Sequence, residues 1–518
     1  MPGVTQHHGV SGVIEALESE ETPGGPGELR KEIAHDYSSS RDGIVPLTAR
    51  RGTWTHHVPL WLTLYAGFAY MSLGSELWSF GYTLRQVLLM TAISGTCYLL
   101  YAIPAAYLGA WRGQTHALMS RSVFGRYGSI LVSLLVLVTP LGWVGYQAGI
   151  LADIWNGLFG WGPVVPIAIA VAVFGIANNI LGFTGIAAFA RWIASPLILV
   201  WVIWMVFRTV TGTSGDVLAS HLTTDSNGQP LTVMPLALGI VMSLGFATYG
   251  NEPDLFRYAK PKVGAIVPPL FIGLLVGQFL FPMAGWIIAA RIQDASLGAG
   301  VAEAVKFSLG GLAVVAFFLV TPTEIAINDA NYYESLNAGQ NLFGGWSRWK
   351  RIYTCIGIAI GGGVMAWWVP QSIDNFFRAV TFLAVTVPTA TVIMYIDQLV
   401  LPKLLGIDRH LERVPSWNQA AVANWPAIVA LVVGIAYGSY GSGILPGQDG
   451  YPLANFGITG VIPVEAWILS AVVYIGLTAV FARGTAREKV LGFPNGASSA
   501  TLTLPVGELA TERVRIDA

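Results

Sequence analysis

Long apolar segments recur along the whole chain and are separated by shorter polar stretches. A helix of about 20 mainly apolar residues is long enough to cross the hydrocarbon core of a bilayer. Twelve such segments can be counted, with approximate bounds of 58–80, 86–110, 128–152, 163–182, 187–209, 232–256, 263–290, 309–333, 352–369, 376–400, 420–440 and 461–482. The pattern predicts an all-α polytopic membrane protein with twelve transmembrane helices.

Lysine and arginine are concentrated in alternate loops between these segments. The cation-bearing loops contain Arg112, Arg121 and Arg126, then Arg257, Lys260 and Lys262, then Arg348, Lys350 and Arg351, then Lys403, Arg409 and Arg413. The intervening loops, such as 153–162, 210–231 and 441–463, contain neither residue type. Cytoplasmic loops are enriched in Lys and Arg, so we expect a multi-pass protein of the cell membrane with both termini in the cytoplasm.

The composition agrees with a membrane protein and argues against nucleic acid and metal ions as partners. Hydrophobic residues make up 54% of the 518 residues and charged residues only 11%, whereas soluble domains carry about 25% charged residues. The formal net charge of −1 argues against a nucleic-acid partner. Cys97 and Cys355 both lie in apolar segments, where a cysteine is more often a small buried hydrophobe than a metal ligand or half of a disulfide. We therefore expect no metal site.

The two ends of the chain differ from the rest. Residues 1–53 are polar and rich in Gly, Pro, Ser and charge, a composition that cannot bury enough apolar surface to fold alone. They contain no basic segment followed by an apolar one, so they do not resemble a signal peptide. We expect a disordered cytoplasmic tail at 1–53 and a second cytoplasmic tail at 484–518.

Two predicted spans contain a similar interruption. The first reads "LWLTLYAGFAYMSLGSELW", with Gly67 and Phe68 at its centre, and the sixth reads "LALGIVMSLGFATYG", with Gly245 and Phe246 at its centre. Transporters place substrate near the membrane midplane, where helices are interrupted at corresponding positions of two repeats. The motif predicts either such paired breaks or two ordinary packing glycines.

The third and eighth spans carry polar side chains within apolar surroundings. Trp143 and Gln147 in "PLGWVGYQAG" are four residues apart and share one helix face. An indole beside an amide suits a flat ligand with polar edges, although Trp143 could equally be a packing residue. Glu324 and Asn328 in "TPTEIAINDANYYESLN" also share a face. A carboxyl group inside a membrane protein can carry a proton near neutral pH, which proton coupling requires. Asp329 lies either in this span or in cytoplasmic water beyond it.

The stretch "SLGFATYGNEPDLFRYAKPK" at 243–262 joins the sixth span to a basic loop. We expect Pro253, Asp254 and Arg257 to lie near the cytoplasmic end with a structural or inner-gate role. Asp254 and Arg257 are three residues apart and could pair on a helix. Substrate contact is expected instead at the apolar half of the stretch.

Four motifs together resemble the nucleobase:cation symporter-1 family, which contains the purine–cytosine permeases and hydantoin transporters. "SRSVFGRYGS" (120–129) resembles the inner-loop signature of that family, and "GWVGYQAG" resembles its third-helix motif. "EPDLFRY" (252–258) is similar to its sixth-helix motif, and "NWPAIVALVVGIAYG" (424–438) to its eleventh helix. The similarity runs from about Gly43 to Arg483.

The resemblance implies a leucine-transporter-type fold with a five-plus-five inverted repeat, assigned to a ten-helix core at 54–400, and two additional helices at 401–483. It implies a symporter that imports a nucleobase or related heterocycle, such as cytosine, a purine, uracil, a hydantoin or allantoin, by alternating access. Carried over position by position, the family's substrate-binding residues fall on Phe68, Trp143, Gln147, Gly245 or Phe246, and Asn328. In this resemblance Trp143 stacks on the base and Asn328 reads its edge.

The coupling ion is inferred from two positions at which this sequence differs from the sodium-coupled members of the family. Sodium-coupled members of the family carry two hydroxyl residues immediately before the position of Asn328, and this chain has Ala326 and Ile327 there. Na⁺ prefers oxygen ligands, which these side chains lack, although Thr321 and Thr323 lie about one turn away. We therefore expect H⁺ rather than Na⁺, with Glu324 as the coupling residue and no other cofactor. Asn251 and Glu252 are a second departure, which leaves the range of substrates open.

Other classes of function remain as alternatives. The same fold could transport an amino acid, a vitamin or an amine, possibly coupled to Na⁺. An enzyme would need nucleophiles or metal ligands gathered near the midplane, but all eight histidines fall in predicted tails, loops or span ends. We therefore expect no catalytic residues. The sequence does not indicate the oligomeric state.

Overall fold

The computed structural model describes most of the membrane domain. The described residues are 30–31, 33–34, 36, 46–47, 52–220, 230, 234–246, 250–293, 311–343, 348–368, 373–406, 420–445 and 457–481. Within these ranges the regular elements are helices, and extended pairing is limited to one bridge between Gly52 and Ala259. The prediction of an all-α protein is confirmed.

The helices follow the predicted spans closely. The first part of the chain forms α3 (Trp54–Tyr65), α4 (Phe68–Ser79), α5 (Leu84–Arg112), α6 (His116–Phe159), α7 (Val164–Gly175), α8 (Ala177–Ile180), α9 (Phe183–Phe189), the π-helical turn η2 (Ala190–Ala194), α10 (Ser195–Thr211) and α11 (Gly215–Ala219). The second part forms α12 (Met234–Phe246), α13 (Asn251–Phe256), α14 (Val263–Leu274), η3 (Leu275–Leu280), α15 (Phe281–Ile292), α17 (Ala313–Phe343), α18 (Arg348–Trp368), α19 (Ile373–Tyr395), η5 (Ile396–Val400), α20 (Leu401–Leu405), α21 (Trp425–Gly441) and α22 (Ile462–Phe481). Every one of the twelve predicted spans falls on one or more of these helices.

Seven continuous helical stretches of the described chain are long and apolar enough to cross a membrane, and three shorter apolar helices accompany them. The apolar helices and the fold together define a multi-pass membrane protein, because in lipid a spanning backbone must satisfy its own hydrogen bonds.

Local sequence explains where the longer helices begin and end. At the start of α5, Thr83 and Gln86 form a capping box, and Gly113 ends the helix with a left-handed backbone. At the start of α6, the Thr115 hydroxyl accepts a hydrogen bond from the Leu118 N–H. Gly125 then interrupts α6 with a φ of 72°, a conformation that glycine adopts readily. The stretch 120–129, expected to be an inner loop, is therefore two helical segments joined at a kink.

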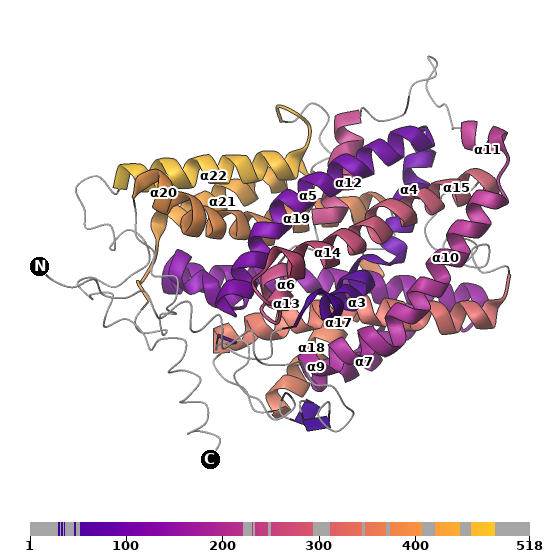
Figure 1. Cartoon of the computed structure of the whole chain (residues 1–518), viewed down its shortest axis with the longest axis horizontal. Helices are drawn as coiled ribbons and strands as arrows, with labels where there is room; N and C mark the ends of the chain where they lie inside the picture. Colours follow the sequence, from indigo (N-terminus) through magenta and orange to yellow (C-terminus); the bar gives the residue numbers. More distant parts are fainter. Residues whose placement is uncertain are drawn as a thin grey trace, which may run out of the picture.

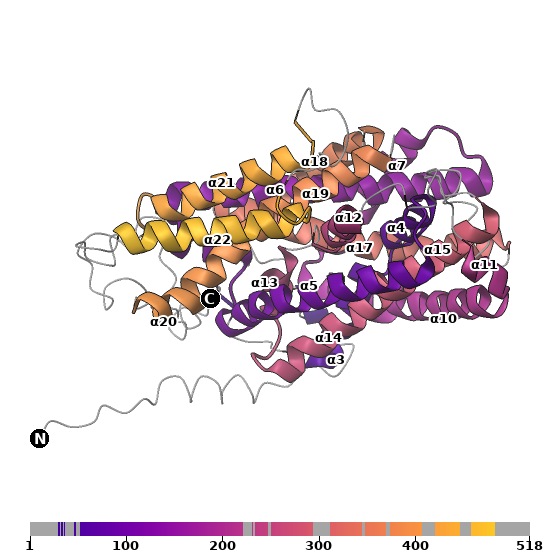
Figure 2. The same cartoon turned by 90° about the horizontal axis from the view of Figure 1, so that it is seen from above.

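The packing places α6 and α17 at the centre. These two helices pack along each other, α18 covers α6 and α7, and α12 lies between α5 and α19. The halves of the first broken helix have separate partners, since α3 packs on α14 and α4 on α15. Figures 1 and 2 show α21 and α22 side by side, next to α19. The two additional helices thus attach to the end of the ten-helix core.

Parts of the predicted N-terminal tail contact this core. The Asp36 side chain accepts hydrogen bonds from the backbone and the hydroxyl of Thr184, at 3.0 and 2.6 Å. Leu47 is buried and its N–H donates to the Gly113 carbonyl. Gly52 pairs with the segment after α13. These described residues do not form a free tail, and the remainder of 1–53 and all of 484–518 lie outside the described residues.

Candidate functional site

The first span is broken at the predicted motif. Helix α3 ends at Tyr65, Ala66 and Gly67 have non-helical backbone angles, and α4 begins at Phe68. At the start of a helix the first N–H groups have no acceptor within the helix. In α4 the Phe68 N–H donates instead to Glu324 Oε1, at 3.2 Å. A carboxylate is favourable at this position because the start of a helix carries partial positive charge.

Glycine is needed at the break because α17 approaches it closely. A Cβ at Gly67 would lie 2.5 Å from Ile327 Cδ1 and 3.5 Å from Glu324 Oε1. The absence of a side chain therefore allows the polar stretch of α17 to reach the broken backbone. Glu324 itself is 1% exposed, and its Oε2 has no hydrogen-bond partner among the described residues.

A small cavity lies at this break. It has a volume of about 20 Å³, enough for about one water molecule. Its lining residues come from α3, α4, α6 and α17 and the break itself: Leu64, Gly67, Ala69, Tyr70, Trp143, Gln147, Ile327 and Asn331. The structure thus brings the predicted residues Trp143 and Gln147 to the same cavity as the first-helix break.

Trp143 and Gln147 line the cavity from α6. Trp143 is 5% exposed, and its ring meets that of Tyr146 edge to face at 5.8 Å. Gln147 is 3% exposed, and its Oε1 has no hydrogen-bond partner among the described residues. A buried amide oxygen without a donor is unfavourable by about 1–3 kcal/mol. The site therefore has an unfilled acceptor beside an aromatic face.

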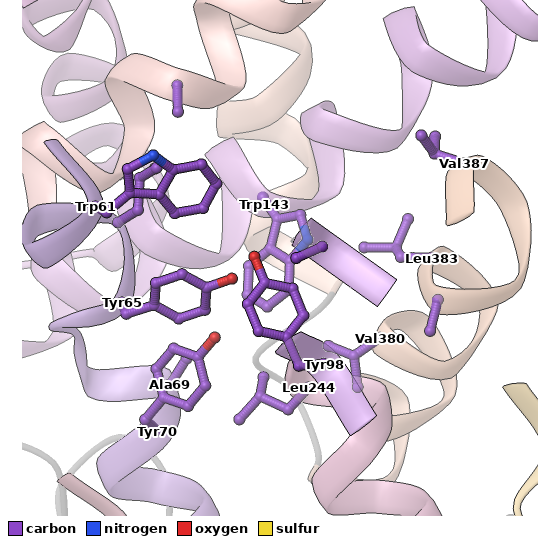
Figure 3. Packing of buried hydrophobic residues seen from close by; sticks show 14 of the residues in the cluster. Trp61, Tyr65, Ala69, Tyr70, Tyr98, Trp143, Leu244, Val380, Leu383 and Val387 are labelled. Atoms are coloured by element: carbon purple, nitrogen blue, oxygen red, sulfur yellow. The ribbon is translucent and has the colours of Figure 1, made fainter. Parts of the chain in front are cut away.

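Tyrosines add polar groups that the sequence reasoning did not identify. Figure 3 shows the hydroxyl groups of Tyr65 and Tyr70 directed toward the side on which Trp143 lies, whereas the Tyr98 hydroxyl donates to Glu252. Tyr70 also lines the cavity. Its position two residues after Phe68, on the first turn of the half-helix α4, is the signal that could have identified it. Polar side chains just past a helix break face the same space as the break itself.

Two further predicted features are the Phe68 side chain and a break in the sixth span. The Phe68 ring packs on Trp201 at 5.3 Å, away from the cavity that its neighbours Gly67 and Ala69 line. Helix α12 runs through Gly245 and ends at Phe246, and helical structure resumes at Asn251. Gly250, which precedes α13, has non-helical backbone angles, so the sixth span is interrupted there. The Phe246 side chain and residues 247–249 lie outside the described part of the chain.

The eighth span is longer and more buried than the sequence suggested. Helix α17 continues to Phe343, and Asp329 is 1% exposed rather than in water. The Asn178 and Asn179 side chains donate to the Asp329 carboxylate at 2.9 and 3.1 Å. Asp329 thus fixes α8 against α17.

Asn328 lies behind the cavity rather than on it. Its Oδ1 accepts a hydrogen bond from Asn331 Nδ2 at 3.1 Å, and Asn331 is the residue that lines the cavity. Asn331 lies about one turn beyond Asn328 on this helix, and the sequence did not lead us to assign it to the site. The rotation of α17 about its axis, which sequence spacing alone leaves undetermined, decides which of the two faces the cavity.

The residues of the "EPDLFRY" stretch lie inside the protein. Asp254 and Arg257 are 1% and 0% exposed. Asp254 accepts hydrogen bonds from the His116 N–H at 2.6 Å and from Asn337 Nδ2 at 2.8 Å, and Arg257 lies within electrostatic reach of it. Pro253 packs against Gly109 of α5. These contacts join α13 to α5, α6 and α17, which suits the structural or inner-gate role predicted for them.

The two threonines near the cavity have bonds within the protein. Thr323 Oγ1 donates to the Val320 carbonyl at 2.7 Å, and Thr321 Oγ1 accepts from Trp155 Nε1 at 2.9 Å. Across the described ranges, no group of three or more His, Cys, Asp or Glu side chains is arranged to hold a metal ion.

The arrangement defines a class of protein: a membrane transporter whose site lies where a spanning helix is broken. The family model described as a permease for cytosine/purines, uracil, thiamine and allantoin matches residues 44–457. The chain belongs to this permease family, and it is not an enzyme.

Relatives of known sequence and structure agree. The chain is 27% identical over 450 residues to the cytosine permeases of Escherichia coli K12 and O157:H7, covering 86% of this chain and 95% of each relative. Its fold is similar to that of Mhp1, a nucleobase-cation-symport-1 family transporter, in a closed conformation with bromovinylhydantoin bound. That match has a TM-score of 0.64 at 16% identity and covers 87% of this chain and 96% of Mhp1.

The inward-facing conformation of Mhp1 also has a TM-score of 0.64 at 16% identity, covering 91% of this chain and 97% of Mhp1. A Na⁺-coupled sialic acid symporter has a TM-score of 0.58 at 11% identity, covering 90% of this chain and 96% of the symporter. The leucine-transporter-type fold with twelve helices is thereby confirmed.

Proposed function

We propose that this protein imports a nucleobase or a related heterocycle, such as cytosine, a purine, uracil, a hydantoin or allantoin, together with a proton. It lies in the cell membrane with both termini in the cytoplasm and works by alternating access. The family match and the cytosine permease relatives support a heterocyclic substrate.

The observation that carries the proposal is the buried amide of Gln147 beside the ring of Trp143 at the cavity. A heterocyclic base has a flat π face and ring or exocyclic N–H groups at its edge. The face stacks on the indole, and an N–H donor completes the buried amide oxygen. Asn331, with Asn328 bonded behind it, offers a second polar group to the same ligand.

The substrate enters only after the cavity enlarges. At about 20 Å³ the cavity is far smaller than a heterocycle, and ligand pockets are typically several hundred Å³. Binding therefore requires movement of the lining side chains or of the half-helix α4.

Glu324 is proposed to carry the proton. It lies directly against the broken backbone through Phe68, so a change of its charge acts on the element that borders the cavity. Protonation removes the charge that the start of α4 stabilises, and so links proton binding to the position of that half-helix. In the same helix Ala326 and Ile327 provide no side-chain oxygen for Na⁺.

A different solute class is the second candidate. The family description includes thiamine, a vitamin, and the sialic acid symporter has a similar fold. Fold alone therefore does not fix the solute. A vitamin or amine substrate would not depend on stacking by Trp143 in the same way.

A binding screen of the purified full chain tests the proposal. Thermal stabilisation is measured across nucleobases, hydantoins, allantoin, thiamine and amino acids, each with and without Na⁺, since a bound ligand stabilises the folded state. We expect stabilisation by one or more heterocyclic bases at either Na⁺ concentration. Stabilisation by amino acids or thiamine alone would overturn the proposed substrate class.

A further inference from the structure

Three carboxyl groups are buried together away from the cavity, where α13 meets α17. Glu252, Asp254 and Glu334 are 0%, 1% and 4% exposed. Glu334 lies within electrostatic reach of both of the others. The proposed function uses none of the three for substrate or proton.

Asp254 is balanced by its surroundings. It accepts two hydrogen bonds, from His116 and Asn337, and Arg257 lies within electrostatic reach. A buried carboxylate with two donors and a nearby guanidinium can remain charged.

Among the described residues Glu252 accepts fewer hydrogen bonds than Asp254, and Glu334 lies within electrostatic reach of two other carboxyl groups. Glu252 Oε1 accepts one hydrogen bond, from the Tyr98 hydroxyl at 3.1 Å, and Oε2 has no partner among the described residues. Arg257 lies within reach of Asp254 and Tyr333. A buried, uncompensated carboxylate costs several kcal/mol, and a proton removes that cost.

The other titratable groups described around Glu252 and Glu334 are tyrosines and one histidine. Tyr98 and Tyr101 face it from α5, Tyr258 and Tyr333 lie beyond Arg257, and the His116 ring is buried against Thr391 of α19 at 2.8 Å. The described side chains here are not arranged to hold a metal ion. A proton on a buried carboxylate removes the charge and with it the cost of burying that charge.

Glu334 also lies against the backbone of the second break. A Cβ at Gly250, the residue that precedes α13, would lie 2.1 Å from Glu334 Oε1. Glu252 follows two residues later on α13. Both carboxyl groups therefore lie at the point where the sixth span resumes as a helix, so their charge acts directly on that half-helix.

We propose that Glu252 and Glu334 form a second proton-binding site, distinct from Glu324, that is protonated in the conformation described here. When water reaches the second break, an O–H bond of the pair breaks, the proton passes to water and the hydrated carboxylate remains. The release favours the conformation in which α13 has moved away from α17. The proton site rests on the packing described above, and its role in transport rests on the proposed function.

The protonation is tested by infrared difference spectroscopy on the purified full chain. Glu252→Gln and Glu334→Gln retain the shape of a protonated glutamate, so both variants should fold, which a melting curve checks. At neutral pH each should lose the absorption of one protonated carboxyl group. Asp216→Asn, at an exposed aspartate of α11, should lose none. Folded Glu252→Gln and Glu334→Gln variants that both keep the full absorption would overturn the proposal.

The role in transport is tested by the pH dependence of base binding. Binding that requires a proton weakens by up to about tenfold per pH unit once that proton is being lost. The double variant Glu252→Gln/Glu334→Gln should retain affinity at low pH and show a flatter decline at high pH than the unmodified protein. An unchanged profile would remove the pair from the transport cycle. Failure of every base to bind would contradict the proposed function and leave the infrared result intact.

Discussion

Gln147 is a buried amide that lines the cavity, and its Oε1 has no donor among the described residues; at the scale of single residues this is the clearest sign of a ligand. Gln398 provides a comparison, because this buried amide of η5 also lacks partners among the described residues but does not line the cavity. Comparing substitutions at the two glutamines therefore distinguishes a contact with the ligand from a general effect of removing a buried amide.

Gln147→Leu should weaken base binding by about 1–3 kcal/mol, or roughly 5- to 150-fold in Kd, because the ligand loses its acceptor. The measurement is equilibrium binding of radiolabelled base to purified protein. Gln398→Leu should leave Kd unchanged. Equal weakening by both substitutions would contradict a direct contact at Gln147.

Trp143→Ala should abolish base uptake while leaving expression intact, because it removes the stacking surface. Stacking of a base on an aromatic ring contributes about 1–3 kcal/mol. Uptake into whole cells checks this, with Trp204→Ala as the control. Trp204 is 45% exposed on α10 and does not line the cavity. Unchanged transport by Trp143→Ala would exclude the stacking role.

Glu324→Gln should separate binding from coupling. The neutral amide can accept the Phe68 N–H as the carboxylate does, but it cannot gain or lose a proton. We expect base exchange between the two sides of a proteoliposome to continue and accumulation driven by a pH gradient to stop. Gradient-driven accumulation at the unmodified level would assign the proton to another group.

At the scale of elements, close contact between helix backbones fixes the half-helices. Gly285 of α15 packs on α4, where an added Cβ would lie 2.0 Å from the Met71 carbonyl oxygen. Backbone cannot move aside as a flexible side chain can. In contrast, a Cβ at Gly476 of α22 would meet nothing within 4 Å.

Gly285→Ala should therefore lower the free energy of unfolding by about 1–3 kcal/mol through overpacking. Gly476→Ala should be neutral or slightly stabilising, because alanine has the higher helix propensity by about 1 kcal/mol. Thermal denaturation in detergent compares the two. A larger loss for Gly476→Ala would contradict the packing of α4 on α15.

The glycine motif in the first and sixth spans shows how well the sequence predicted where these helices are interrupted. The glycine motif allowed either a break or a packing glycine in the first span, and the structure shows a break at Ala66 and Gly67. In the sixth span Gly245 lies within α12, and the described interruption is at Gly250, before α13. A single glycine is compatible with a helix, so the spacing alone did not locate this interruption.

At the scale of the whole molecule, the proposed coupling makes a prediction about ions. Uptake into proteoliposomes should be unaffected by replacing Na⁺ with K⁺ or choline and should stop when an uncoupler collapses the proton gradient. The physical reason is the lack of side-chain oxygen at Ala326 and Ile327 together with the carboxyl group of Glu324 at the break. Strict Na⁺ dependence would contradict it.

The sequence by itself determined that the chain spans a membrane many times as helices. In lipid each segment must satisfy its own backbone hydrogen bonds, so length and hydropathy suffice to locate a span. It also determined that Trp143 and Gln147 share a face, because helical spacing requires it.

Only the tertiary structure decided which polar groups meet. Glu324 reaches the Phe68 N–H across 256 positions of sequence, and Asn331 rather than Asn328 faces the cavity. Glu252 and Glu334, 82 positions apart by their residue numbers, share one buried region. The rotation and depth of each helix follow from how all of them pack together, and no local pattern in the sequence encodes that sum of contacts.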